Sequence, residues 1–204
     1  QTVASGRTLS ADEAAHAIDL LTDDATPVQM GAFLMGLRVR GETVDEITGA
    51  ARAVRKRMTS VTVADDAIDI VGTGGDGHGT FNVSTASAIV AAGAGLKVAK
   101  HGNRSVSSLS GASDVLSALG VKLDPSHDAI VRAVDEAGVG FLWAPMHHPA
   151  MKAWAPIRAD LGIRTLFNLL GPICNPANVK HHVLGVFAPE WVVPIAEVLR
   201  ALGS

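Results

Sequence analysis

The sequence is 204 residues long, is 48% hydrophobic and has a formal net charge of −3. A chain of this length can bury a sizeable core, and its mild acidity argues against general nucleic-acid binding by a strongly basic surface. Its one cysteine, Cys174, excludes an internal disulfide framework, and no apolar run approaches the length of a membrane span. We therefore expect a cytoplasmic protein with no nucleic-acid or membrane partner.

The N-terminal part of the chain predicts a small helical domain over residues 1–64. The signals for three helix starts are Ser10 with Glu13, Thr26 with Pro27, and Thr43 with Glu46. Two of these pairs have the spacing of capping boxes, and the third places proline at its tolerated first helical position.

The rest of the chain, residues 65–204, alternates between strand and helix patterns and predicts an α/β domain. The predicted strands span residues 67–71, 96–100, 121–123, 139–143 and 183–187. The predicted helices lie near residues 83–94, 112–119, 126–137 and 189–202. Repeated strand–helix–strand units indicate a mainly parallel sheet flanked by helices.

A glycine-rich loop follows the first predicted strand, with five glycines between Gly72 and Gly79. Such a loop can turn its peptide N–H groups inward around an anion, and the next helix adds its positive N-terminal end. A dinucleotide fold is disfavoured because the helix is delayed until about Asn82 and the next strand is basic where an acid is required. A Walker loop is disfavoured because His78 replaces its lysine. A phosphorylated sugar remains the best ligand for this loop.

A second polar cluster, residues 100–108, follows the next predicted strand. Lys100 and Arg104 supply charge, while the asparagine and serines between and after them supply neutral hydrogen bonds. Ligands of open parallel sheets gather at the carboxyl ends of the strands, so we expect the two loops to face one crevice. An ordinary solvated turn is the alternative for this cluster taken alone.

Short motifs along the chain resemble those of anthranilate phosphoribosyltransferase in the same order and at similar separations. They occupy residues 72–76, 82–85, 100–103, 109–114, 148–151, 155–158 and 167–172, and so cover essentially the whole chain. The resemblance implies the nucleoside phosphorylase/phosphoribosyltransferase type of fold, with residues 145–178 packing back on the helical domain. It also implies a homodimer formed through that domain.

The implied reaction belongs to tryptophan biosynthesis. It moves the phosphoribosyl group of phosphoribosyl pyrophosphate (PRPP) to the amino group of anthranilate, with Mg²⁺ as cofactor and pyrophosphate as the second product. Catalysis would rest on positioning and on stabilisation of pyrophosphate, so no covalent catalytic residue is expected.

The resemblance also implies which residues bind each ligand. The implied PRPP contacts are Gly72, Gly75, Asp76, Thr80, Asn82, Val83, Ser84, Thr85, Lys100, His101, Gly102, Asn103, Arg104, Ser105, Val106, Ser107, Ser108 and Ala112. Asn103 and Arg158 match the family's anthranilate contacts, and Ser84 matches a Mg²⁺ ligand. Simple helix capping is the alternative for Ser84 and Thr85, and it can coexist with the ligand role. A surface ion pair with Asp160 or a nearby acid is the alternative for Arg158.

The family also carries an Asp-Glu pair in a later segment that binds Mg²⁺, and residues 1–204 contain no match to it. We therefore expect a chain that is truncated relative to the family, with an incomplete sheet and low activity by itself. A pyrimidine nucleoside phosphorylase is the rival enzyme. A nucleic-acid-binding relative without catalysis, and a structural fragment that dimerises, are the rivals from other classes.

Overall fold

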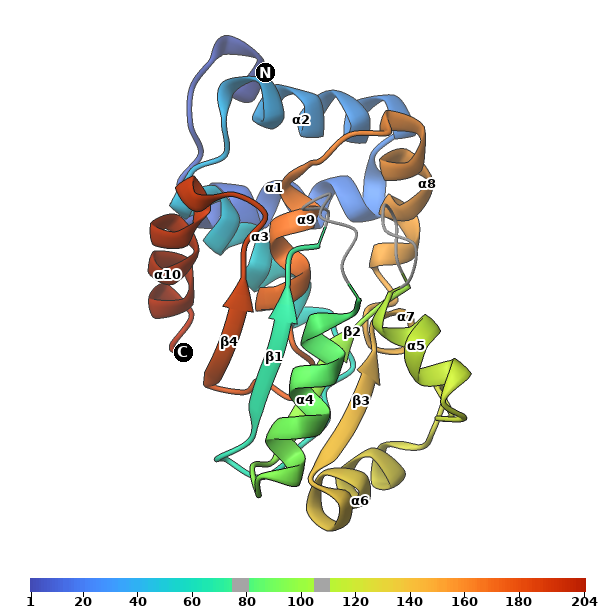
Figure 1. Ribbon diagram of the computed structural model, residues 1–204. Helices are drawn as coiled ribbons and strands as arrows, with labels where there is room; N and C mark the ends of the chain where they lie inside the picture. Colours follow the sequence, from blue (N-terminus) through green and yellow to red (C-terminus); the bar gives the residue numbers. More distant parts are fainter. Residues whose placement is uncertain (75–80, 105–110) are drawn as a thin grey trace. The chain divides into compact units, whose positions relative to one another are not determined.

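The structure is a computed structural model that describes residues 1–74, 81–104 and 111–204 (Figure 1). The chain forms two compact units. Unit 1 contains residues 1–58, 148–174 and 192–203, and unit 2 contains residues 59–147 and 175–191 together with Ser204. Each unit therefore combines segments that are far apart in the sequence.

Unit 1 is helical. Its elements are η1 (Val3–Ser5), α1 (Ala11–Asp24), α2 (Pro27–Arg40), α3 (Val44–Lys56), α8 (Met151–Leu161), α9 (Leu166–Ile173) and α10 (Val192–Ala201). The predicted helix starts are confirmed, because the Ser10 and Thr43 side chains accept hydrogen bonds from the backbone N–H groups of Glu13 and Glu46. The C-terminal helix, which we expected beside the sheet, groups with unit 1 instead.

The core of unit 1 depends on close helix packing and on one buried tryptophan. A Cβ atom placed on Gly49 of α3 would lie 2.0 Å from the backbone oxygen of Ala11, so the glycine permits α1 and α3 to approach. Trp154 of α8 is fully buried, and its Nε1 donates to Thr22 Oγ1 of α1 over 2.9 Å. Residues about 130 positions apart in sequence thus share one core.

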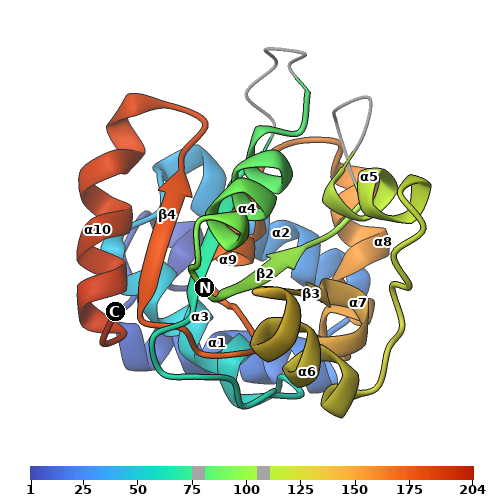
Figure 2. The same ribbon diagram turned by 60° about the horizontal axis from the view of Figure 1, so that its bottom comes forward.

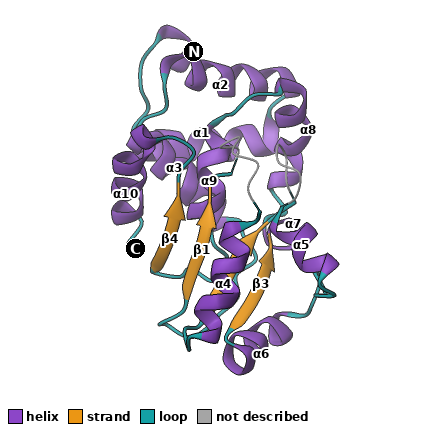
Figure 3. Cartoon of the chain, viewed as in Figure 1, coloured by secondary structure: helices purple, strands orange, loops and turns teal. Residues whose placement is uncertain are grey.

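Unit 2 is an α/β unit. It contains β1 (Ile68–Gly72), α4 (Val83–Gly93), β2 (Val98–Gly102), α5 (Ala112–Ala118), α6 (His127–Ala137), β3 (Val139–Trp143), α7 (Ala144–His147), β4 (His181–Gly185) and η2 (Pro189–Trp191). In the described part of the chain the strands form a four-stranded parallel sheet in the order β3-β2-β1-β4 (Figure 3). The predicted fold class is confirmed.

Three details of the strand prediction are wrong. The second strand spans Val98–Gly102 rather than residues 96–100, so Lys100 lies within it and not at its end. Residues 121–123 form no strand; they belong to the connection between α5 and α6, and Leu123 packs from there against the cluster of Ala112, Leu116 and Phe141. The last strand begins at His181 rather than at Val183, because its parallel pairing with β1 starts where Ile68 meets His181.

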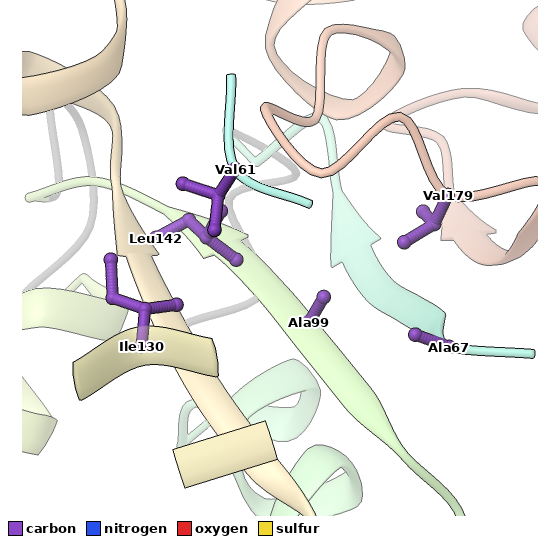
Figure 4. Packing of buried hydrophobic residues seen from close by; sticks show 6 residues of the cluster. All are labelled: Val61, Ala67, Ala99, Ile130, Leu142 and Val179. Carbon is purple, nitrogen blue, oxygen red and sulfur yellow. The ribbon is translucent and has the colours of Figure 1, made fainter. Parts of the chain in front are cut away.

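The two faces of the sheet are covered by different helices. α4 packs on one face through Ala88, which lies against Ile70 and Val98. On the other face, Figure 4 shows Val61, Ala67, Ala99, Ile130, Leu142 and Val179, which form one buried cluster. Ile130 comes from α6, which lies beside β3 in Figures 1 and 2. Side chains alternate between the faces along each strand, as the pleat requires.

The two ends of the long segment of unit 2, residues 59–147, are joined by a reciprocal pair of hydrogen bonds. The Thr59 N–H donates to the His147 backbone oxygen over 2.7 Å, and His147 Nδ1 lies 2.9 Å from the Thr59 oxygen. Since a carbonyl only accepts, Nδ1 carries the proton. Burial lowers the pKa of His147, which disfavours the protonated form of the ring.

Among the helices of the described residues, none has both the length and the apolar character needed to cross a membrane.

Candidate functional site

The candidate site lies where β1 and β2 end and α4 begins. In Figure 1, α4 runs back along the sheet from the end at which the arrowheads of β1 and β2 point. The Thr73 N–H that follows β1 donates to the Gly185 oxygen of β4 over 2.9 Å, which fixes the start of the loop. Peptide N–H groups in the first turn of α4 therefore lie at the C-terminal ends of β1 and β2.

Asn82 caps α4 and organises its first turn. Its Oδ1 accepts from the Thr85 N–H over 3.0 Å and lies 3.2 Å from Ser84 Oγ. The capping that we considered as an alternative for Ser84 and Thr85 is performed by Asn82. Val83 is half-exposed, whereas Thr85 is buried and its Oγ1 has no hydrogen-bond partner among the described residues.

Lys100 is the most unusual side chain of the site, because a lysine is almost never fully buried without a partner. It is 2% exposed, and its Nζ donates to the Ile70 oxygen of β1 over 2.8 Å and to Ser84 Oγ over 3.2 Å. Burial lowers its pKa to about 8, against the opposing attraction of Asp69. The ammonium thus lies between the end of β1 and the first turn of α4.

Asp69 and Asn175 form a buried polar group on the other face of the sheet that the sequence did not lead us to expect. Asp69 Oδ1 accepts from the His101 N–H over 3.2 Å, and Oδ2 accepts from Asn175 Nδ2 over 2.8 Å. Burial raises the pKa of Asp69 to about 6, against the opposing effects of the Asn175 hydrogen bond and the Lys100 charge. The sequence feature that could have indicated this polar group is Asp69 itself, an acidic residue inside an otherwise apolar strand.

Gly102, Asn103 and Arg104 lead out of β2. A Cβ atom on Gly102 would lie 3.0 Å from both Ala112 Cβ and the Phe141 ring, so this strand end packs tightly on α5 and β3. Asn103 Oδ1 accepts from the Arg104 N–H over 2.7 Å, and the Asn103 oxygen accepts from the Ser113 N–H of α5 over 3.3 Å. The hydrogen bond from Ser113 thereby joins the backbone of this segment to α5.

Arg158 lies in unit 1, on α8. Its guanidinium stands 5.5 Å from the centre of the Phe167 ring, and burial lowers its pKa. No acid in the described ranges pairs with Arg158, so the surface ion pair with Asp160 is not found. A partly buried cation over an aromatic ring is suited to a planar anionic ligand.

Part of the predicted PRPP site lies outside the described residues. This part comprises Gly75, Asp76, Thr80, Ser105, Val106, Ser107 and Ser108. Of the other predicted contacts, Gly72, Asn82, Ser84 and Lys100 are gathered by the ends of β1 and β2 and the start of α4. No cluster of three or more His, Cys, Asp or Glu side chains suited to a metal ion occurs within residues 1–74, 81–104 and 111–204.

Two family descriptions match the chain and divide it between them. Residues 1–58 match the helical bundle domain of a glycosyl transferase family, and residues 64–204 match the α/β domain of that family. The chain therefore belongs to this glycosyl transferase family.

Its similar relatives within the family are anthranilate phosphoribosyltransferases. The enzymes of Rhodopseudomonas palustris (strain TIE-1) and Xanthobacter autotrophicus (strain ATCC BAA-1158 / Py2) are 61% and 57% identical over 203 residues. These alignments cover 99% of this chain and 60% and 59% of the two relatives. The chain thus spans about three fifths of the length of the curated relatives it matches.

Solved structures agree with the sequence relatives. The crystal structure of anthranilate phosphoribosyltransferase from Thermus thermophilus matches with a TM-score of 0.94 and 47% identity, covering 100% of this chain and 62% of that one. The enzyme from Saccharomyces cerevisiae in complex with PRPP and Mg matches with a TM-score of 0.85 and 35% identity, covering 96% of this chain and 59% of that one. The resemblance found in the motifs is confirmed.

Proposed function

We propose that this chain carries the PRPP-binding part of an anthranilate phosphoribosyltransferase. The observation that carries the proposal is the buried Lys100 ammonium, held 3.2 Å from Ser84 Oγ at the N-terminal end of α4. A cation beside a helix N-terminus suits a highly anionic sugar phosphate. The sequence relatives and the yeast enzyme with PRPP and Mg support the same assignment.

In the proposed reaction, the bond between C1 of the ribose and pyrophosphate breaks while the anthranilate amino nitrogen forms a bond to C1. The nitrogen then loses a proton, and pyrophosphate leaves with the bonding electron pair. Positive charge develops on the sugar, as at other glycosidic centres. Lys100 and the N–H groups at the start of α4 would stabilise the negative charge that gathers on the leaving pyrophosphate.

The residues present fit Mg²⁺ as a partial site. Asn82 Oδ1 and Ser84 Oγ, 3.2 Å apart, are hard oxygen atoms of the kind that Mg²⁺ prefers, and we assign Ser84 as a ligand. Magnesium usually takes most other ligands from substrate phosphates and water. When bound, the ion would supply positive charge to the pyrophosphate.

Several further assignments belong to the same proposal. The PRPP contacts are those given above from Gly72 to Ala112, and Asn103 and Arg158 are the anthranilate contacts. We also propose the domain division at residues 64 and 65, a homodimer formed through the helical domain, a cytoplasmic location and a role in tryptophan biosynthesis. No observation favours the phosphorylase or the nucleic-acid-binding alternative.

The test is the loss of anthranilate fluorescence on mixing the 204-residue chain with anthranilate, PRPP and Mg²⁺. Control reactions omit one component each, and a parallel reaction supplies thymidine and phosphate. Turnover that requires all three components supports the proposal. Absence of both turnover and PRPP binding contradicts it, and phosphate-dependent cleavage of thymidine would favour the phosphorylase.

A further inference from the structure

The parallel pairing between β1 and β2 is unusually short. Its register consists of one residue pair, Ile68 with Val98, whereas β1 pairs with β4 and β2 pairs with β3 along their full lengths. Buried backbone groups beyond that pair need other partners, because an unpaired buried N–H or C=O group is costly. These groups lie directly before the two loops of the candidate site.

Side chains supply the missing hydrogen bonds from both faces of the sheet. From the α4 face, Lys100 Nζ donates to the Ile70 oxygen of β1 over 2.8 Å. From the opposite face, Asp69 Oδ1 accepts from the His101 N–H of β2 over 3.2 Å. Asn175 Nδ2 donates to the Ala99 oxygen of β2 over 2.8 Å.

The two residues on the second face also hold each other. Asn175 Nδ2 donates to Asp69 Oδ2 over 2.8 Å, and Asn175 Oδ1 accepts from the Ala177 N–H over 2.7 Å. Both amide hydrogens and the amide oxygen of Asn175 are therefore used, and this fixes its orientation. Asp69 and Asn175 are 0% and 1% exposed, so neither can contact a ligand in bulk solvent.

We propose that Asp69 and Asn175 are positioning residues of the PRPP site, which set the separation of the β1 and β2 ends and hold Lys100 in place between them. This inference rests on the proposed function. An anion site gains most when its donors are fixed before the ligand arrives, because no binding energy is then lost in ordering them. The charge of Asp69 also favours the buried ammonium of Lys100, whose two hydrogen-bond acceptors, the Ile70 oxygen and Ser84 Oγ, are both neutral.

Exchanging the acid and the amide between positions 69 and 175 tests this arrangement. In Asp69→Asn, the new Nδ2 faces Asn175 Nδ2, so two donors oppose each other. In Asn175→Asp alone, two carboxylates oppose each other. The double variant restores one donor and one acceptor between the two side chains and keeps a negative charge. It also places a carboxylate oxygen opposite the Ala99 oxygen, where Asn175 Nδ2 donated, so its recovery is expected to be partial.

The experiment measures PRPP binding to the 204-residue chain by calorimetry in the presence of Mg²⁺. Each single variant is expected to raise the Kd of PRPP at least about tenfold, and the double variant to recover at least about threefold of that loss. Asp66→Asn is the matched control, since Asp66 is an exposed acid three positions earlier, and its Kd should equal that of the wild type. Thermal unfolding of each variant is recorded in parallel.

A second measurement needs no ligand. Amide hydrogen exchange at His101 is expected to rise at least about tenfold in Asn175→Asp and Asp69→Asn relative to amides of α6, because the Asp69 acceptor is displaced or weakened. A folded Asp69→Asn variant with a wild-type Kd overturns the inference. So does a double variant that recovers the unfolding temperature but not PRPP binding, since the role is then structural only. Wild-type protein that fails to bind PRPP while the exchange effect is present contradicts the proposed function instead.

Discussion

Replacement of Arg158 by alanine should selectively weaken the use of anthranilate. The guanidinium is partly buried over the Phe167 ring, and no acid among the described residues neutralises it. A hydrogen bond between charged groups contributes about 1.5–3 kcal/mol, which corresponds to roughly a tenfold to 150-fold rise in KM or Kd at 1.4 kcal/mol per factor of ten. Arg158→Lys keeps the charge but loses the planar pair of donors, and should fall between the wild type and the alanine variant.

The assay follows anthranilate fluorescence at saturating PRPP, with direct titration of anthranilate where turnover is slow. Arg132→Ala, which removes an arginine from α6, far from the acceptor contacts in sequence, is the control. Loss of the contact with Phe167 should lower the stability of Arg158→Ala by about 0.5–1 kcal/mol, so unfolding is measured as well. Anthranilate parameters that stay within about twofold of the wild type in a folded Arg158→Ala variant would refute the reasoning.

Three further predictions concern packing and pH. Gly49→Ala should destabilise the protein by about 1–3 kcal/mol in urea unfolding, because the new Cβ would meet the Ala11 oxygen at 2.0 Å. Gly102→Ala should raise the Kd of PRPP at least about threefold in calorimetry, since the strand end must shift away from the atoms that its Cβ would meet at 3.0 Å. His147→Asn should flatten the loss of stability on acidification. The folded-state pKa of His147 is lowered by burial, so the unfolded chain takes up the proton first as pH falls through about 6.5, and stability then falls by at most about 1.4 kcal/mol per pH unit.

Each of these predictions has a matched control. Gly93→Ala and Gly185→Ala add a Cβ that meets no atom within 4 Å, so neither should reproduce the effects of Gly49→Ala or Gly102→Ala. His16→Asn removes an exposed histidine from α1 and should leave the pH profile unchanged. Equal stability of the two variants Gly49→Ala and Gly93→Ala, or an unchanged acid profile in His147→Asn, would show that the stated contact is not responsible.

Local signals predicted the helix starts well, because each depends on residues that lie within one turn. Ser10 with Glu13 and Thr43 with Glu46 close their capping boxes inside a single turn, and Asn82 begins α4 where the delayed helix was expected. Residues 121–123 gave an apolar alternation without a strand, since Leu123 reaches the core from a connection. An alternation of only three residues is the same for a short strand and for a connection that buries one side chain, so the sequence could not distinguish them.

The buried polar side chains could not be placed from the sequence. Asp69 and Asn175 are 106 positions apart, and their hydrogen bond exists because the segment after α9 crosses the sheet face that Asp69 occupies. Lys100 was singled out because it ends a predicted strand and matches a family motif, although in the structure it lies within β2. Its burial and its contact with the Ile70 oxygen depend on the separation of β1 and β2, which only the tertiary structure fixes.

The discontinuity of unit 1 has a consequence for protein synthesis. A ribosome extends the chain at about 5–20 residues per second and releases the N-terminus first. The partners of the first three helices then arrive much later: Trp154 contacts Thr22 of α1, and the Ile173 oxygen accepts from Arg55 Nε of α3. For several seconds the emerging helices therefore expose the apolar faces that α8 and α9 will later cover. Unit 1 completes its packing only after most of the sheet has been synthesised.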